Sequence, residues 1–116
     1  MKPRRTKLQL SGPLTFGGWR KVLACVDYQT YVHPWPPTQV EQRQAIVVAI
    51  GELGVLELND ACGVTTVRAS WGFLVIPPVG FPELKISFRP EVPVQTLSEI
   101  LAYIEQRIAN YTRIRP

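Results

Sequence analysis

Three clusters of prolines divide this chain into short segments and limit the length of most strands and helices. They lie at residues 34–37, 77–82 and 90–93. A proline has no backbone N–H to donate, and it biases the preceding residue toward extended backbone, so a strand or helix does not continue through such a cluster. The segments between the clusters must supply the secondary structure.

Several of these segments carry the pattern of β-strands. Residues 7–11 and 83–88 alternate apolar and polar side chains, which is the period of a half-buried strand. Other segments are rich in aromatic residues, Val, Leu, Ile or Thr, and we predict strands over residues 19–27, 29–33, 64–69 and 71–76. The last two are either separate strands or one strand bent at Gly72.

Two segments predict helices, because each opens with the Thr-x-x-Glu pattern of a capping box. The boxes are Thr38–Glu41 and Thr96–Glu99. After the second box, apolar residues recur at helical spacing and predict a C-terminal helix that faces a core. They are Leu97, Ile100, Leu101, Ile104 and Ile108.

The first of these helices has an alternative. It would cover residues 38–53, but the β-branched cluster at 46–50 weakens helix propensity. The alternative is a strand over 45–50 that turns into a second strand over 55–58. Helix is the preferred interpretation, and the pattern leaves open whether residues 38–53 form one helix or a short helix plus a strand.

Together these segments predict an α+β fold with a mainly antiparallel sheet of four to six strands. Two helices pack on one face of that sheet, and the second helix is C-terminal. The 116 residues match one domain, 1–116. The succession from a strand through prolines into a helix occurs twice, which suggests two strand-strand-helix halves, although prolines and caps are also the ordinary boundaries of such elements.

The basic residues gather at the two ends of the chain. Residues 1–7 and 107–116 contain no acid and together carry a charge of +7, whereas residues 8–106 carry −3. Basic ends suit contact with a polyanion, because each neutralised phosphate releases condensed counterions. The alternative is that residues 1–7 and 112–116 are flexible, solvated ends that aid solubility.

Several protein classes are not indicated by the sequence. The longest apolar runs, 45–50 and 73–76, are far shorter than the roughly 20 residues of a membrane-spanning helix, and no signal peptide is recognisable. We therefore expect a cytoplasmic protein without membrane contact. Cys25 and Cys62 form neither a CxxC pair nor part of a Cys/His cluster, so we expect both to be core thiols.

Catalytic and cofactor signatures are also missing from the sequence. His33 is the only histidine, which excludes a two-histidine metal site, and we expect it to be a partly exposed turn residue. Gly17 and Gly18 precede a strand pattern rather than the helix N-terminus of a phosphate loop. We therefore expect no enzyme activity, no metal and no cofactor. A small carboxylate-based hydrolase or nuclease built on Asp27 and Asp60 is a secondary alternative.

The preferred functional hypothesis is a non-enzymatic interaction protein. It would be an adaptor, or a subunit of a homo-oligomer or larger intracellular complex, that binds a protein partner or a second copy. Exposed apolar loops mark such contacts, and an open sheet face or edge can receive another chain. The predicted partner-binding residues are Trp35, Pro36, Pro37, Val79 and Phe81.

The alternative hypothesis is a nucleic-acid-binding accessory protein that uses its basic termini and the aromatic residues of its strands. Bases stack on aromatic rings while basic side chains follow the phosphates. The candidate residues for this function are Lys2, Arg4, Arg5, Lys7, Trp19, Arg20, Lys21, Arg113 and Arg115. Large aromatic residues are equally the usual filling of a small core.

Overall fold

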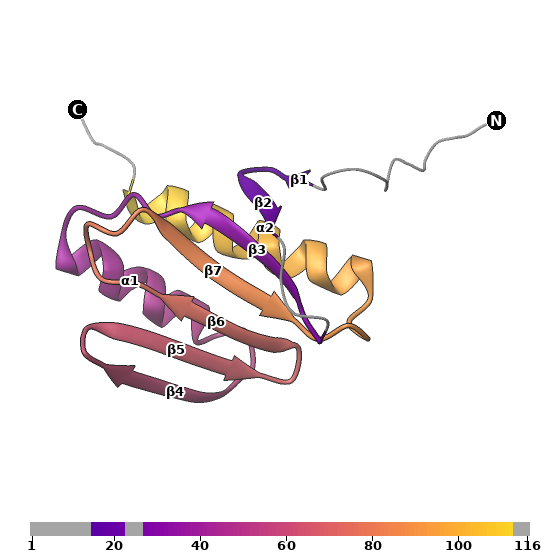
Figure 1. The fold of residues 1–116 in the computed structure, drawn as a ribbon. Helices are drawn as coiled ribbons and strands as arrows, with labels where there is room; N and C mark the ends of the chain where they lie inside the picture. Colours follow the sequence, from indigo (N-terminus) through magenta and orange to yellow (C-terminus); the bar gives the residue numbers. More distant parts are fainter. Residues whose placement is uncertain (1–14, 23–26, 113–116) are drawn as a thin grey trace.

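The computed structural model describes residues 15–22 and 27–112, and these form one antiparallel sheet with two helices (Figure 1). In chain order the elements are β1 (Thr15–Phe16), β2 (Trp19–Val22), β3 (Gln29–Pro34), α1 (Val40–Ile50), β4 (Val55–Ala61), β5 (Val64–Ala69), β6 (Gly72–Ile76), β7 (Glu83–Phe88) and α2 (Val94–Thr112). The strand order is β1-β2-β3-β7-β6-β5-β4. Six strands have at least four residues and β1 has two, so the predicted α+β fold with a C-terminal second helix is confirmed.

The strand predictions agree closely with the structure in the second half of the chain. β7 has the predicted bounds, and β5 and β6 are separate strands. Gly72 opens β6 with a φ of 146°, and a Cβ there would lie 2.0 Å from the Ser87 carbonyl oxygen, so only glycine fits. The predicted strand over residues 7–11 lies outside the described residues.

The helices form where they were expected, but they begin at different residues. Gln42 rather than Glu41 reaches back at the start of α1, where its Oε1 accepts hydrogen bonds from the backbone N–H groups of Thr38 (2.8 Å) and Gln39 (3.1 Å). α2 begins at Val94, so the predicted cap Thr96 lies inside its first turn. The first box was therefore placed one residue too early, since Gln39 rather than Thr38 caps α1. The second box lies inside α2, because Thr-x-x-Glu occurs within helices as well as at their starts.

The core lies between the sheet and the two helices, which cover the same face (Figure 1). The predicted apolar stripe of α2 is buried, as are Ile46, Val47 and Ile50 of α1. Burial against the sheet offsets the weak helix propensity of these β-branched residues. Burial also raises the pKa of Tyr31 on β3, because the phenolate form is poorly solvated there.

Arg43 of α1 fastens this helix to one end of the sheet. Its Nε donates to the carbonyl oxygen of Pro77 at 2.8 Å. Its Nη2 lies within 3.1 Å of Thr65 Oγ1 and of the carbonyl oxygens of Gly63 and Ile76. One guanidinium thus donates to three backbone carbonyls and a hydroxyl where α1 meets the sheet.

The strand-strand-helix order does occur twice, as β2-β3-α1 and β6-β7-α2. β3 begins at residue 29 and β7 at 83, and α1 begins at 40 and α2 at 94, so the same 54 residues separate each pair. The two halves meet where β3 pairs antiparallel with β7, with Tyr31 opposite Ile86 and Val32 opposite Lys85 at the centre. β3 and β7 therefore have corresponding places in the two strand-strand-helix units.

Candidate interaction surface

The two edges of the sheet differ greatly in length. β1 has two residues, whereas β4 has seven, and no described strand lies beyond either. Six of the seven residues of β4 are exposed, including Leu56 (69%) and Leu58 (43%). A long exposed edge strand offers unpaired N–H and C=O groups to another strand.

The tight turn after β4 determines which of its backbone groups point outward. Cys62 and Gly63 have φ values of 56° and 80°, which is the pattern of a two-residue type I′ hairpin. The flanking pair, Ala61 and Val64, carries the turn hydrogen bond, and hydrogen-bonded pairs alternate along an antiparallel ladder. The N–H and C=O groups of Leu58 and Asp60 therefore point away from β5.

The charges of β4 are already bound within the sheet. Arg68 of β5 donates to Glu57 Oε1 from Nη2 (2.5 Å) and Nε (3.0 Å). The Thr65 hydroxyl donates to Asp60 Oδ1. β4 contains neither lysine nor proline, and its bulge lies at its start, between Val55 and Glu57. The stretch from Glu57 to Ala61 thus lacks the lysine, proline or bulge that usually prevents another strand from pairing with an edge strand.

Sequence reasoning considered residues 55–58 as a strand only under the alternative for the first helix. The alternation of Leu56 and Leu58 with Glu57 and Asn59 was the available signal. That signal indicates a strand but not its place in the sheet. β4 extends to Ala61 and so includes Asn59 and Asp60.

The structure brings the two predicted partner-binding loops together. The backbone N–H of Trp35 donates to the carbonyl oxygen of Pro82 at 2.9 Å, and this bond extends the β3–β7 ladder into both loops. Pro36 is exposed and the Phe81 side chain is 55% exposed, whereas Val79 is partly buried. Trp35 (5% exposed) and Pro37 are buried, so they serve the core rather than a partner surface.

The predicted nucleic-acid-binding residues have different surroundings. Trp19 is 1% exposed and its Nε1–H donates to the Leu101 carbonyl oxygen at 2.8 Å, so its ring is inaccessible to a base. Arg20 is exposed and pairs with Glu83 at 2.7 Å, and Lys21 is exposed. The remaining candidates, Lys2, Arg4, Arg5, Lys7, Arg113 and Arg115, lie outside the described residues.

Two sequence expectations about single residues are wrong. His33 is buried within β3 rather than partly exposed in a turn, because β3 continues to Pro34 and stacks His33 beside Trp19 at 4.9 Å. Cys62 is exposed at the β4–β5 turn rather than in the core. Cys25 lies outside the described residues.

The two carboxylates suggested for hydrolysis do not share a site. Asp27 precedes β3, whereas Asp60 lies on β4, and β7, β6 and β5 separate these strands. With a spacing of about 4.8 Å between strands, β3 and β4 are roughly 19 Å apart. Within the described residues no group of three His, Cys, Asp or Glu side chains could hold a metal ion, and no described helix is long and apolar enough to cross a membrane.

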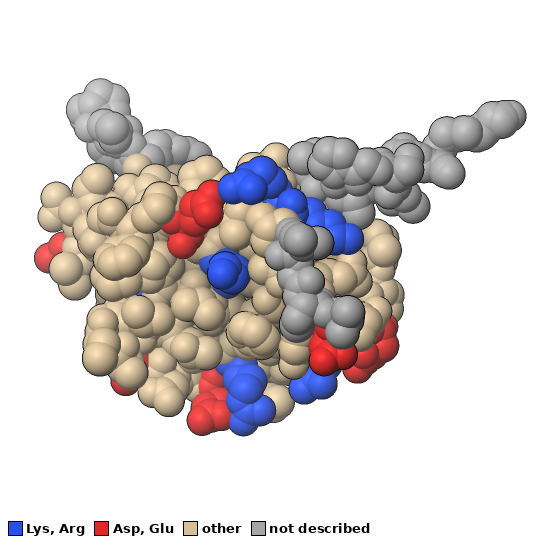
Figure 2. Space-filling view, in the orientation of Figure 1, with Lys and Arg blue, Asp and Glu red and all other residues tan. Residues whose placement is uncertain are grey.

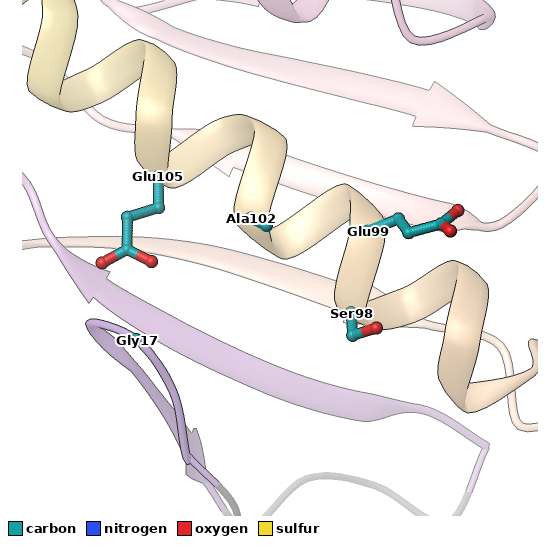
Figure 3. A pocket seen from close by; sticks show the side chains of 5 residues that line it. All are labelled: Gly17, Ser98, Glu99, Ala102 and Glu105. Carbon is teal, nitrogen blue, oxygen red and sulfur yellow. The ribbon is translucent and has the colours of Figure 1, made fainter.

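A pocket of about 390 Å³ lies between the β1–β2 turn and α2 and is lined by Gly17, Ser98, Glu99, Ala102 and Glu105 (Figure 3). Figure 3 shows Glu105 turned toward this turn, whereas Glu99 points elsewhere along the helix. Glu105 Oε2 accepts from the Gly18 N–H and lies 3.7 Å from His33 Nε2. His33 Nδ1 lies 2.7 Å from the Pro34 carbonyl oxygen, so this polar cluster mainly fastens the turn to the helix.

Comparisons with protein-family models, curated proteins and solved structures found no match to this chain.

Proposed function

We propose that this protein is a non-enzymatic subunit of a homo-oligomer and that it assembles by antiparallel pairing of β4 with β4 of a second copy. The observation that carries this proposal is the regular, exposed stretch Glu57–Ala61, whose carboxylates are bound internally. Unpaired backbone groups of an edge strand gain hydrogen bonds when another strand is added.

The side-chain pattern of β4 is compatible with antiparallel pairing to β4 of a second copy. Side chains directly opposite each other in an antiparallel pair lie on the same face of the sheet. Glu57 lies opposite Arg68 on the sheet face that the helices do not cover, whereas Asp60 lies opposite Thr65 on the helix-covered face. If a twofold axis perpendicular to the sheet relates the two copies, the helix-covered faces of both copies lie on the same side of the joined sheet. Glu57 and Asp60 of different copies are then never directly opposite each other.

A pairing centred on Leu58 satisfies both the backbone and the side chains. Leu58 points its backbone groups outward, so it exchanges hydrogen bonds with Leu58 of the second copy. Glu57 then faces Asn59, and the exposed parts of both Leu58 side chains are buried against each other. Burial of apolar area favours association by roughly 25 cal/mol per Å² before the entropy of association is subtracted.

A second copy is favoured over a charged partner strand because the edge offers no free charge to select one. Arg68 neutralises Glu57, and Asp60 accepts from Thr65. The contact is also isologous, since one surface serves both copies, which is the commonest interface of soluble homo-oligomers.

Sedimentation equilibrium over a range of micromolar concentrations tests this proposal with the full chain. We expect a species of twice the 13.1 kDa of one chain and a shift to the monomer in Leu58→Lys, since an edge lysine blocks strand addition. Val94→Lys is the matched control, because Val94 is an exposed apolar residue outside β4, and it should leave the mass unchanged.

Two results would overturn the proposal. One is a monomer at every concentration. The other is dissociation by Phe81→Lys but not by Leu58→Lys, which would assign the contact to the loops around Trp35 and Phe81.

A further inference from the structure

The sheet face opposite the helices carries two rows of side chains that cross several strands. Pairing of β2 with β3, β3 with β7, β7 with β6 and β6 with β5 aligns them. One row contains Arg20, Val32, Lys85, Val75 and Thr66, and the other contains Val22, Thr30, Ser87, Phe73 and Arg68. Val32, Thr30 and Ser87 are buried, so the accessible groups of this face are mainly Lys85 and the side chains of β5 and β6. Among the described residues, Figure 2 shows a largely uncharged surface, with basic and acidic groups mainly at its margins and a lone basic group near its middle.

Two aromatic rings lie together on this face. Tyr28 and Phe73 meet edge to face, with ring centroids 5.2 Å apart and an interplanar angle of 74°. Both side chains are partly exposed, unlike the buried aromatic residues Trp19, Tyr31, Trp35 and Trp71. The pair therefore offers ring surface to a planar ligand.

The charges beside these rings favour an anionic ligand. Lys85 is exposed, stands between Val32 and Val75 in its row, and forms no ion pair among the residues of the described ranges. Among the neighbouring acids, Glu83 and Glu57 are each bound by an arginine, and Asp27, which precedes Tyr28 in the chain, is exposed. The net positive charge of the centre of the face therefore comes from Lys85.

A polar hollow adjoins the aromatic pair. It has a volume of about 220 Å³ and is lined by Glu57, Asn59, Thr66 and Arg68. Arg68 pairs directly with Phe73, so the hollow begins at the ring. Amide, hydroxyl, guanidinium and carboxylate groups together can donate to and accept from the edge of a heterocyclic base.

We propose that the accessible part of this sheet face binds single-stranded nucleic acid, with unpaired bases stacked on Phe73 and Tyr28 and the phosphate backbone near Lys85. Partly exposed rings, an exposed cation and base-edge groups on one sheet face are the features that such ligands require. A duplex is disfavoured, because its paired bases offer no faces to the rings.

The rings and Lys85 are separate from the pairing at β4, although Glu57 and Asn59 of the hollow belong to that strand. Strand addition uses the outward backbone groups of β4 and does not involve β6, β7 or Tyr28. Loss of the oligomer would therefore leave Phe73, Tyr28 and Lys85 in place, and the two proposals fail separately.

Fluorescence anisotropy with a labelled 15-nucleotide oligo(dT), alone and as a duplex with oligo(dA), tests the proposal with the full chain. We expect the single strand to bind more tightly than the duplex. Lys85→Gln and Phe73→Leu should each weaken single-strand binding by roughly five- to tenfold, the lower range for one stacking or phosphate contact. Circular dichroism shows whether each variant is folded. If Phe73→Leu is not folded, Lys85→Gln still tests the proposal, because Lys85 is exposed and its replacement should leave the fold intact.

Lys21→Gln is the matched control, because it removes the same charge from a residue that pairs with Tyr31 and so lies on the other face. It should change the affinity less than twofold. The proposal is overturned if no binding occurs at low salt, if duplex and single strand bind equally, or if Lys21→Gln and Lys85→Gln weaken binding to the same extent, since each indicates at most non-specific charge attraction.

Discussion

The Gly18 N–H donates a 2.7 Å hydrogen bond to Glu105 Oε2, although 87 residues separate the two in the chain. The bond joins the β1–β2 turn to the middle of α2. A carboxylate acceptor strengthens such a bond, and partial exposure of Glu105 weakens it through solvent screening.

Glu105→Ala should lower the free energy of unfolding by about 1 kcal/mol, because the Gly18 N–H loses its acceptor. Glu105→Gln should lose less, since its amide oxygen still accepts. Urea unfolding followed by tryptophan fluorescence measures both. The control is Glu99→Ala, whose side chain accepts a hydrogen bond from Gln95 on the same helix and whose loss should change stability by a few tenths of a kcal/mol. Equal effects of both alanine variants would contradict the assignment.

Gly72→Ala should destabilise the fold by about 3 kcal/mol or more. A Cβ at Gly72 would lie 2.0 Å from the Ser87 carbonyl oxygen on the neighbouring strand, and its φ of 146° is itself unfavourable for alanine. Gly54→Ala separates these two causes, because Gly54 has a φ of 71° but no atom within 4 Å of an added Cβ. Its expected cost is about 1 kcal/mol. Thermal unfolding gives the comparison, and equal costs would remove the steric explanation.

Alkaline pH should destabilise the fold partly through Tyr31. Burial raises its pKa above 10.0, so the folded chain holds the phenolic proton when the unfolded chain has released it. This contribution is fully present below pH 10 and is lost as the pH rises through the higher pKa of the folded state. The free energy of unfolding of the wild type should therefore fall faster above pH 10 than that of Tyr31→Phe, by up to about 1.4 kcal/mol per pH unit.

Denaturant unfolding at pH 7, 9 and 11 measures this difference. Tyr111→Phe, at an exposed site, should follow the wild type. Parallel curves for the wild type and Tyr31→Phe would show that the buried phenol does not contribute.

Arg43→Met should destabilise the protein by about 2–4 kcal/mol, because three backbone carbonyls and the Thr65 hydroxyl lose a charged donor at the partly buried end of the sheet. Arg20→Met removes an exposed ion pair with Glu83 and should cost less than about 1 kcal/mol. Chemical denaturation ranks the two variants. A cost for Arg43→Met no greater than for Arg20→Met would mean that water replaces the guanidinium without loss.

Local pattern alone was sufficient for β7 and for the buried stripe of α2. In both, the apolar residues repeat at the period of the element, 2 in the strand and close to 3.6 in the helix, so each buried face follows from neighbouring residues. The glycine and proline positions that end the strands are local in the same sense. The α+β class of the fold follows from these elements.

Three features come from long-range packing: β4 is an edge strand, Trp19 and Trp35 are buried, and Tyr28 and Phe73 meet on the sheet face opposite the helices. A period of two identifies two faces of a strand but not which strands lie beside it. Strand order, and the register that places Lys85 between Val32 and Val75, depend on pairings between residues far apart in the chain. The interaction surfaces are what those pairings leave uncovered. Local pattern therefore indicates most of the strands and helices, whereas long-range packing sets which of them another molecule can reach.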